Sequence, residues 1–185
     1  MRKLITSNFV SLDGYLAGPG GDLSWHAVND EFFSYAESML EAAGTLVFGR
    51  KTYELMFSYW TQEQVKVDDP VIARYMNTLD KVVFSTTMPK ADWEHTTLFN
   101  SDVEKNIAAL KQAEGKDIVI LGSGTIVSLL TQAGLIDEHR IFINPVILGG
   151  GTYQYTGQLE RKALTLTDMR RFKTGVVMLS YQPVK

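Results

Sequence analysis

Three stretches of the sequence place glycine, basic or hydroxyl residues directly after a short apolar run. One of them is Gly122-Ser123-Gly124, which follows the apolar run Ile118–Leu121. A further apolar pattern comes next, so this order predicts a buried strand, a tight turn and a helix that starts near Thr125. Glycine lets a ligand approach the backbone closely, and the first turn of a helix leaves N–H groups free to bind it. The turn therefore suits a phosphate or pyrophosphate group.

This glycine turn does not identify its ligand on its own. Val127 stands where a dinucleotide-binding fingerprint has its third glycine, and no lysine follows the turn as it does in a P-loop. A strand–helix turn without any ligand is the alternative interpretation.

A second stretch has the same order and adds positive charge. The run Thr45–Phe48 leads directly into Gly49, Arg50, Lys51 and Thr52. Arginine offers a forked donor to phosphate oxygens and lysine offers a point charge. A solvated basic pair is the alternative, but two such strand ends in one chain favour an extended anion such as a dinucleotide.

A third stretch places hydroxyl groups after an apolar run. Ser85 and Thr86 follow Val82–Phe84. Open α/β sheets bind ligands at the carboxyl ends of their strands, where these hydroxyls could donate to phosphates. Ordinary turn chemistry explains the same residues almost as well.

The elements that must position these stretches follow from the apolar periodicity. Strands are predicted over Leu4–Val10, Thr45–Phe48, Lys81–Phe84, Thr97–Phe99, Ile118–Leu121 and Glu138–Pro145, with a terminal hairpin over Ala163–Phe172 and Gly175–Gln182. Helices are predicted from a cap at Asn29 or Asp30 to Gly44, after Gly49, over Pro70–Leu79, from a cap at Asp102 to about Gln112, and from near Thr125 to Gly134. This alternation predicts one α/β domain over residues 1–185, with a largely parallel sheet and an antiparallel edge.

Composition excludes several classes of function. The formal charge of -3 argues against a nucleic-acid surface, and the absence of cysteine excludes disulfides, thiol catalysis and cysteine-type zinc sites. The three histidines are too scattered for a local metal pair, so no metal site is predicted. There is no signal-like segment or apolar run of membrane-spanning length. We expect a cytoplasmic protein that does not contact a membrane.

In this order the motifs resemble those of the dihydrofolate-reductase-like superfamily, and more closely its branch related to the reductase domain of bacterial riboflavin biosynthesis. The resemblance rests on five segments spread along nearly the whole chain: Ser11–Gly14, Phe48–Glu54, Val83–Thr86, Leu121–Gly124 and Ile136–Gly151. It implies a three-layer α/β fold with a mixed sheet of about eight strands, flanked by helices and ending in an antiparallel hairpin.

The resemblance also implies an NADPH-dependent reductase. Arg50 and Ser85 would contact the adenosine 2′-phosphate, and Gly49, Lys51, Thr52 and Thr86 would lie along the phosphates. The pyrophosphate would rest on the turn formed by Leu121, Gly122, Ser123, Gly124, Thr125 and Ile126. Asp13 and Trp25 would line the nicotinamide and substrate end, with Asp13 as the candidate proton donor. A homodimer is implied as well, with the strand Gly175–Tyr181 as a candidate contact.

The substrate stays open at this point. The resemblance implies a ribosylaminopyrimidine of the kind reduced in riboflavin biosynthesis, with a pterin as the alternative. In dihydrofolate reductases an acidic residue early in the helix before the second strand anchors the pterin, whereas the spacing back from Gly49 points here to Phe33 rather than to Asp30 or Glu31. A nucleotide-binding dimer without catalytic activity is the alternative from another class of function.

Overall fold

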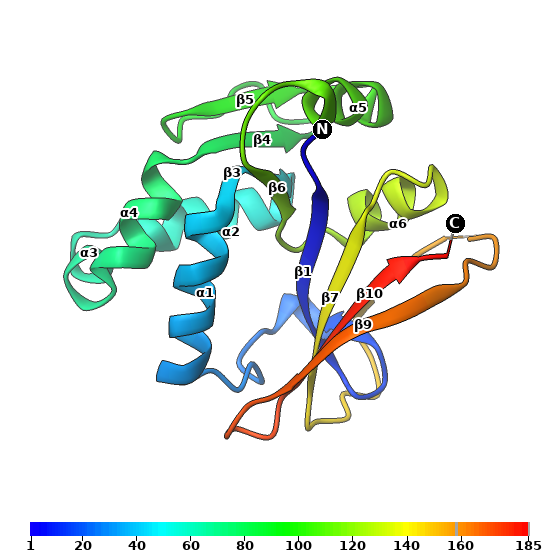
Figure 1. The fold of residues 1–185 in the computed structure, drawn as a ribbon. Helices are drawn as coiled ribbons and strands as arrows, with labels where there is room; N and C mark the ends of the chain where they lie inside the picture. The colour runs from blue at the N-terminus through cyan, green and yellow to red at the C-terminus, as the bar shows by residue number, and fades with distance from the viewer. Residues whose placement is uncertain (158, 185) are drawn as a thin grey trace.

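The computed structural model describes residues 1–157 and 159–184. Its main sheet has eight strands in the order β5-β4-β3-β6-β1-β7-β10-β9 (Figure 1). Neighbouring strands from β5 to β7 are parallel, and β7, β10 and β9 are antiparallel. The strands are β1 Leu4–Ser11, β3 Ala43–Gly49, β4 Asp80–Phe84, β5 Thr96–Phe99, β6 Asp117–Ile120, β7 Glu138–Asn144, β9 Leu164–Arg171 and β10 Val177–Pro183. The predicted mixed sheet and its C-terminal hairpin are confirmed.

Helices cover both faces of this sheet, which gives three layers. On one face lie α1 Asp30–Ala42, α2 Arg50–Trp60 and α4 Pro70–Thr78, with the short α3 Glu63–Asp68 between the last two. On the other face lie α5 Val103–Gln112 and α6 Gly124–Gln132. A third, smaller cluster packs Phe142 of β7 and Met178 of β10 against the aromatic residues of α1.

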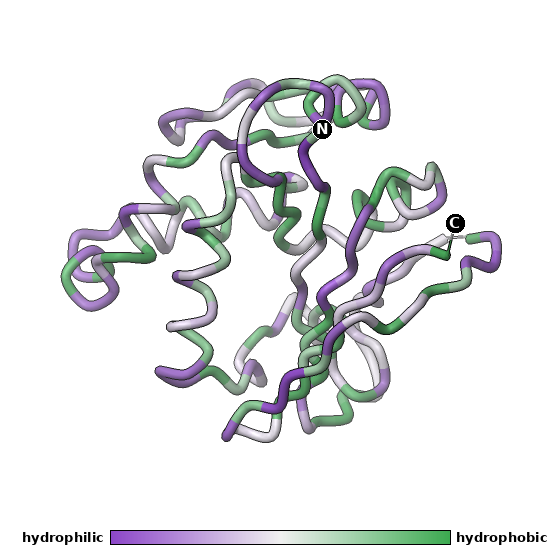
Figure 2. The backbone as a smooth tube through the Cα atoms, in the orientation of Figure 1, coloured by the Kyte–Doolittle hydropathy of each residue, from purple (hydrophilic) through white to green (hydrophobic). Residues whose placement is uncertain are grey.

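The central strands are apolar on both faces because helices cover them from both sides. In β6, Ile118 and Ile120 pack toward α5 and α6, and Val119 packs toward α1, α2 and α4. Full burial of each such side chain contributes about 1.5–3 kcal/mol relative to exposure. Figure 2 shows the same pattern along the chain, with hydrophobic colour on the inner strands and hydrophilic colour on many of the outer turns.

A second, two-stranded sheet joins the loop that follows β1 to the loop that follows β7. It pairs β2 Tyr15–Ala17 with β8 Thr152–Tyr153. The rings of Tyr15 and Tyr153 stack with centroids 4.2 Å apart, and their hydroxyls lie 2.9 Å from each other. Gly151 packs so closely that a Cβ atom there would overlap the carbonyl oxygen of Ala17. This loop can therefore hold no side chain at position 151.

Two local predictions differ from the structure. Gly44 does not end the first helix, because α1 ends at Ala42 and Gly44 lies within β3, where a Cβ atom would come within 3.1 Å of Lys116 and 3.2 Å of Arg2. Asp102 precedes α5 as predicted, but its side chain makes no capping hydrogen bond and instead accepts one from the Ser101 hydroxyl. The short helix α3 was missed.

None of the helices in the described part of the chain is both long enough and apolar enough to cross a membrane.

Candidate functional site

A cleft of about 1420 Å³ opens at the carboxyl ends of β3, β4 and β6. Ligands of open α/β sheets bind at this edge. All the residues predicted to bind the cofactor line the cleft: Gly49, Arg50, Lys51, Thr52, Ser85, Thr86, Leu121, Gly122, Ser123, Gly124, Thr125 and Ile126. The structure therefore brings together three stretches that lie far apart in the sequence.

The two glycine turns interlock at the floor of this cleft. A Cβ atom on Gly49 would overlap the hydroxyl oxygen of Ser123, and one on Gly122 would come within 2.5 Å of Thr52 Oγ1. Gly122 also has a φ of 69°, a conformation that L side chains rarely adopt. Glycine is thus required at both turns so that the N-termini of α2 and α6 can lie side by side.

Ser123 caps the helix that the second turn begins. Its side-chain oxygen accepts a hydrogen bond from the Ile126 N–H at 3.4 Å, and its own backbone is left-handed with φ of 51°. The first N–H groups of a helix have no acceptor within the helix, and they carry the positive end of its dipole. The start of α6 is therefore suited to hold a phosphate group.

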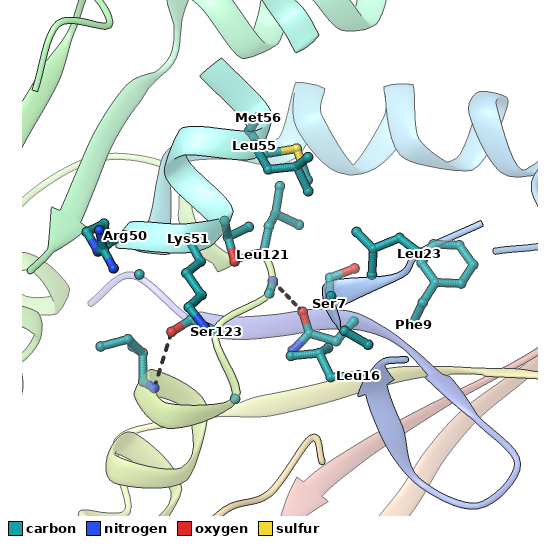
Figure 3. Close-up of a pocket in the computed structure, with 18 of the residues that line it drawn as sticks. Ser7, Phe9, Leu16, Leu23, Arg50, Lys51, Leu55, Met56, Leu121 and Ser123 are labelled. Carbon is teal, nitrogen blue, oxygen red and sulfur yellow. Dashed lines mark hydrogen bonds between the residues drawn. The ribbon is translucent and has the colours of Figure 1, made fainter. Parts of the chain in front are cut away.

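Asn8, which the sequence interpretation missed, binds the backbone of the turn Gly122–Gly124 from the neighbouring strand β1. Its Oδ1 accepts a hydrogen bond from the Gly122 N–H at 2.6 Å, shown as a dashed line in Figure 3. Its Nδ2 donates to Thr6 Oγ1 at 3.0 Å and to Gln154 Oε1 at 3.2 Å. Its place inside a predicted strand, next to Thr6 and Ser7, was the signal that could have revealed it, because buried polar groups are nearly always hydrogen-bonded.

Positive charge is confined to one end of the cleft. In Figure 3 the side chain of Lys51 points toward Ser123, and Arg50 lies beside it on the first turn of α2. Arg50 makes only an exposed contact with Glu54 at 3.6 Å, and no carboxylate of the described residues pairs with Lys51. Both cations are thus available to an anion.

Ser85 lies at the same end of the cleft. Its oxygen accepts hydrogen bonds from the N–H groups of Thr87 and Met88, at 3.2 and 3.0 Å. These bonds occupy its acceptor capacity and orient the hydroxyl, which can still donate its proton to an anion. Thr87, Asn100 and Ser101 add further polar groups to this wall.

The other end of the cleft is apolar. Its walls come from β1, from β2 and the loop after it, and from α1 and α2. The apolar side chains there are Phe9, Leu16, Leu23, Phe32, Phe33, Met39, Leu55 and Met56. In Figure 3 Leu121 lies between the two ends, with Arg50 and Lys51 on one side and Phe9, Leu16 and Leu23 on the other. The cleft therefore joins a compartment for an anion to one for an apolar group.

Asp13 and Trp25 are absent from the described residues that line this cleft. The carboxylate of Asp13 accepts hydrogen bonds from the N–H groups of Leu148 and Gly149, at 3.1 and 2.8 Å. The Ser11 hydroxyl and these two N–H groups lower the pKa of the Asp13 carboxyl to about 2. The indole of Trp25 donates to the Asp22 carbonyl at 2.9 Å. Both side chains tie loops together beside the cleft.

His26 lines the apolar end, although sequence reasoning gave it no role there. Its ring stacks on Phe9, with centroids 4.7 Å apart, and meets the edge of Trp25. Burial lowers the pKa of His26 to about 4, and the nearby charge of Asp22 only partly opposes this. The imidazole is therefore neutral at physiological pH.

The acidic residues near the pterin-anchoring position lie outside the cleft. Neither Asp30 nor Glu31 is among its described lining residues, and Phe33 is. Glu31 instead accepts a hydrogen bond from the Lys173 N–H at 2.9 Å and contacts Arg170 at 3.4 Å. Phe33, to which the spacing back from Gly49 points, thus gives this part of the cleft an apolar side chain.

Residues 2–178 match the family model described as the RibD C-terminal domain. The chain belongs to the RibD C-terminal domain family. One relative in this comparison is the protein YyaP of Bacillus subtilis (strain 168), which is 28% identical over 180 residues that cover 97% of this chain and 94% of YyaP.

Solved structures share the fold of this RibD C-terminal domain. A deaminase/5-amino-6-(5-phosphoribosylamino)uracil reductase from Thermotoga maritima superposes with a TM-score of 0.71 at 15% identity, covering 99% of this chain and 57% of that one. Dihydrofolate reductase from Enterococcus faecalis, solved with NADP(H), superposes with a TM-score of 0.62 at 18% identity, covering 99% and 97%. The dihydrofolate-reductase-like fold is confirmed.

Proposed function

We propose that this protein is an NADPH-dependent reductase of a planar nitrogen heterocycle. One observation carries the proposal: Arg50, Lys51, Ser85 and the N-terminus of α6 converge at one end of a cleft whose other end is apolar. The family and the shared fold support it, since the Thermotoga maritima protein is named as a reductase and the Enterococcus faecalis protein was solved with NADP(H).

The residues of the cleft fit this cofactor. The guanidinium of Arg50 and the hydroxyl of Ser85 would bind the 2′-phosphate, and Lys51 would neutralise charge over the pyrophosphate. The tight contact of Gly122 with Thr52 leaves backbone, rather than side chains, facing the pyrophosphate beside the first N–H groups of α6. When bound, NADPH supplies a hydride.

The chain's own contribution would be to orient the two reactants. The apolar walls around Leu121 would hold a flat ring against the nicotinamide end. Reduction of a C=N bond also requires a proton on nitrogen. Asp13, with a pKa of about 2, is ionised at neutral pH. Its carboxylate is held by the Leu148 and Gly149 N–H groups and is not among the described lining residues of the cleft, so we propose that the proton comes from solvent rather than from Asp13.

Exchange of Arg50 for alanine tests the cofactor assignment. Titration with NADPH and NADH, followed by tryptophan fluorescence, should show tighter binding of NADPH to the parent protein. A charged hydrogen bond contributes about 1.5–3 kcal/mol, so Arg50→Ala should weaken NADPH binding about tenfold or more and leave NADH binding nearly unchanged. Arg74→Ala is the matched control, because Arg74 stacks over Tyr75 and is not a described lining residue of the cleft.

Equal affinity of the parent protein for the two nucleotides would contradict the 2′-phosphate assignment. NADPH binding without consumption, across pyrimidine, pterin and aromatic imine acceptors, would favour the alternative of a nucleotide-binding protein without turnover.

We also propose that the protein forms a homodimer. The edge strand β9 exposes Leu164, Leu166 and Met169, the last with 65% of its surface accessible. These three side chains share one face of the hairpin with Leu179 and Tyr181, as the strand register shows. Burial of this face against a second copy would remove a row of apolar side chains from water.

A further inference from the structure

The apolar end of the cleft has no cation to receive a phosphate. Its described lining residues from β1, β2, α1, α4 and the part of α2 beyond Thr52 include no lysine or arginine, whereas Arg50 and Lys51 lie at the cofactor end. Burial holds His26, which lines the same end, neutral at physiological pH. Apart from polar but uncharged side chains such as Ser7 and Asn8, an anionic group placed here would meet aromatic rings and aliphatic chains.

The segments that build this end carry only negative charge. Residues 15–42 contain five acidic residues and no lysine or arginine: Asp22, Asp30, Glu31, Glu37 and Glu41. Residues 52–65 add Glu54 and Glu63, again without a basic residue. Glu54, Glu63 and Glu31 contact Arg50, Lys66 and Arg170, so within the described part of the chain the unpaired negative charge of these segments comes from Asp22, Asp30, Glu37 and Glu41. These four carboxylates offer an approaching anion no attraction.

Two arginines lie behind this wall, near Tyr35, and both are already paired. Arg140 donates to Tyr35 Oη at 3.3 Å and forms an ion pair with Glu138 at 2.6 Å. Arg170 lies 5.8 Å from the centroid of the Tyr35 ring and contacts Glu31 at 3.4 Å. Neither belongs to the described lining of the cleft, so neither supplies a free positive charge to it.

We infer that the substrate is an uncharged aromatic nitrogen heterocycle that carries neither a phosphate nor a carboxylate group. This inference rests on the proposed function and deepens it, because it separates the substrate from the phosphoribosyl compound named for the Thermotoga maritima reductase. Transfer of an unpaired anion into an apolar compartment costs several kcal/mol, whereas burial of a ring there is favourable by about 25 cal/mol per Å².

Two matched pairs of ligands test the inference on the protein saturated with NADP⁺. Quinoxaline is compared with quinoxaline-2-carboxylate, and 5-amino-6-ribosylaminouracil with its 5′-phosphate, by isothermal titration calorimetry. In each pair the uncharged member should bind at least about tenfold more tightly. A phosphorylated uracil that binds as tightly as its unphosphorylated partner, or more tightly, overturns the inference.

Leu55→Lys adds the missing cation. Leu55 is 45% exposed on α2, so a lysine can be accommodated there without burying its ammonium group. This variant should reduce the ratio of the two binding affinities within each pair of ligands by at least threefold. Val67→Lys on α3 is the matched control, since Val67 is 72% exposed and is not a described lining residue, and it should leave the difference unchanged.

A measurement of nucleotide binding distinguishes failure of the proposed function from failure of the inference about the substrate. If NADP⁺ and NADPH do not bind the parent protein, the proposed function itself fails. If they bind and the anionic ligands are nevertheless preferred, only the inference about the substrate fails. An unchanged NADPH affinity in Leu55→Lys would show that the added charge acts on the substrate compartment alone, and a changed ligand preference in Val67→Lys would count against the local explanation.

Discussion

Asn8 is the residue on which the position of the glycine turn depends most directly. It is 2% exposed, and its carboxamide uses both ends, accepting from the Gly122 N–H and donating to Thr6 and Gln154. An asparagine in this position costs conformational freedom and desolvation, which its hydrogen bonds offset. Its contribution is to hold the backbone where the pyrophosphate is proposed to bind.

Exchange of Asn8 for alanine should therefore affect both stability and cofactor binding. The Gly122 N–H would lose its buried acceptor, which costs about 1–3 kcal/mol of the free energy of unfolding. We expect the same variant to bind NADPH more weakly, because the turn would no longer be held. Urea denaturation and fluorescence titration measure the two effects.

Asn106→Ala is the control for Asn8→Ala, because Asn106 makes its hydrogen bonds at the exposed start of α5. It should keep the NADPH affinity of the parent protein. Unaltered NADPH affinity in Asn8→Ala would show that the turn keeps its position without this hydrogen bond.

The apolar compartment shows what sequence reasoning could not reach at the level of single residues. Arg50, Lys51 and Ser85 were predictable, because each stands directly after an apolar run and the local pattern indicates a strand end. Phe9, Leu23 and Leu55 come from three separate elements and look like ordinary core residues in the sequence. Only their arrangement in space shows that they line a cleft rather than the interior.

At the scale of elements, the site depends on two strand–turn–helix units, β3–α2 and β6–α6, whose turns pack against each other at glycine residues. The N-termini of α2 and α6 approach each other because Gly49 and Gly122 leave space for Ser123 and Thr52. Each unit alone was recognisable in the sequence. Their contact was not, because β3 and β6 become neighbours only in the folded sheet.

Gly49→Ala should separate the two units. A methyl group there would overlap Ser123 Oγ, and overpacking of this kind typically costs about 1–3 kcal/mol. We expect a lower melting temperature and weaker NADPH binding, measured by thermal denaturation with and without NADPH.

Gly150→Ala provides the comparison for Gly49→Ala. The nearest atom to a Cβ at position 150 is Pro19 Cγ at 3.9 Å, which is ordinary van der Waals distance. This variant should behave as the parent protein does. Normal nucleotide binding by Gly49→Ala would mean that the close contact between the two turns is dispensable.

Predictions of where a helix begins or ends were wrong where tertiary contacts override the local sequence signal. Gly44 looks like a helix terminator, yet it belongs to β3, because Ala43 already pairs with Asp117 of β6. Asp102 looks like a cap, yet its carboxylate accepts a hydrogen bond from the Ser101 hydroxyl at 2.7 Å and none from the backbone N–H groups of α5. The order of strands and helices was predictable, because it follows from long apolar patterns.

At the scale of the whole molecule, the proposed dimer uses the antiparallel edge of the sheet. The sequence interpretation named Gly175–Tyr181 as the contact. However, β10 lies between β7 and β9, so β9 is the edge strand and carries the more exposed apolar side chains. This edge is remote from the cations of the cleft, so association and cofactor binding can be tested separately.

Met169→Lys should convert the dimer to a monomer, because it places a charge within the exposed apolar face of the hairpin. Size-exclusion chromatography with light scattering measures the mass, and NADPH affinity should stay within about twofold of the parent value, because Met169 does not line the cleft. Leu12→Lys, at another exposed apolar residue, should remain dimeric. A parent protein that is monomeric at every concentration would refute the proposed dimer.

The place of β1 in the sheet has a consequence for how the chain acquires its structure. This strand is the first to be synthesised, yet its two neighbours are β6 and β7, which follow only after α1 to α5. During translation β1 therefore leaves the ribosome with both hydrogen-bonding edges open and no partner. Pairings between such distant segments slow folding, and open apolar strands are prone to aggregate. Because Asn8 lies on this strand, we expect the turn at Gly122, where the nucleotide is proposed to bind, to be fixed only after β6 has been synthesised.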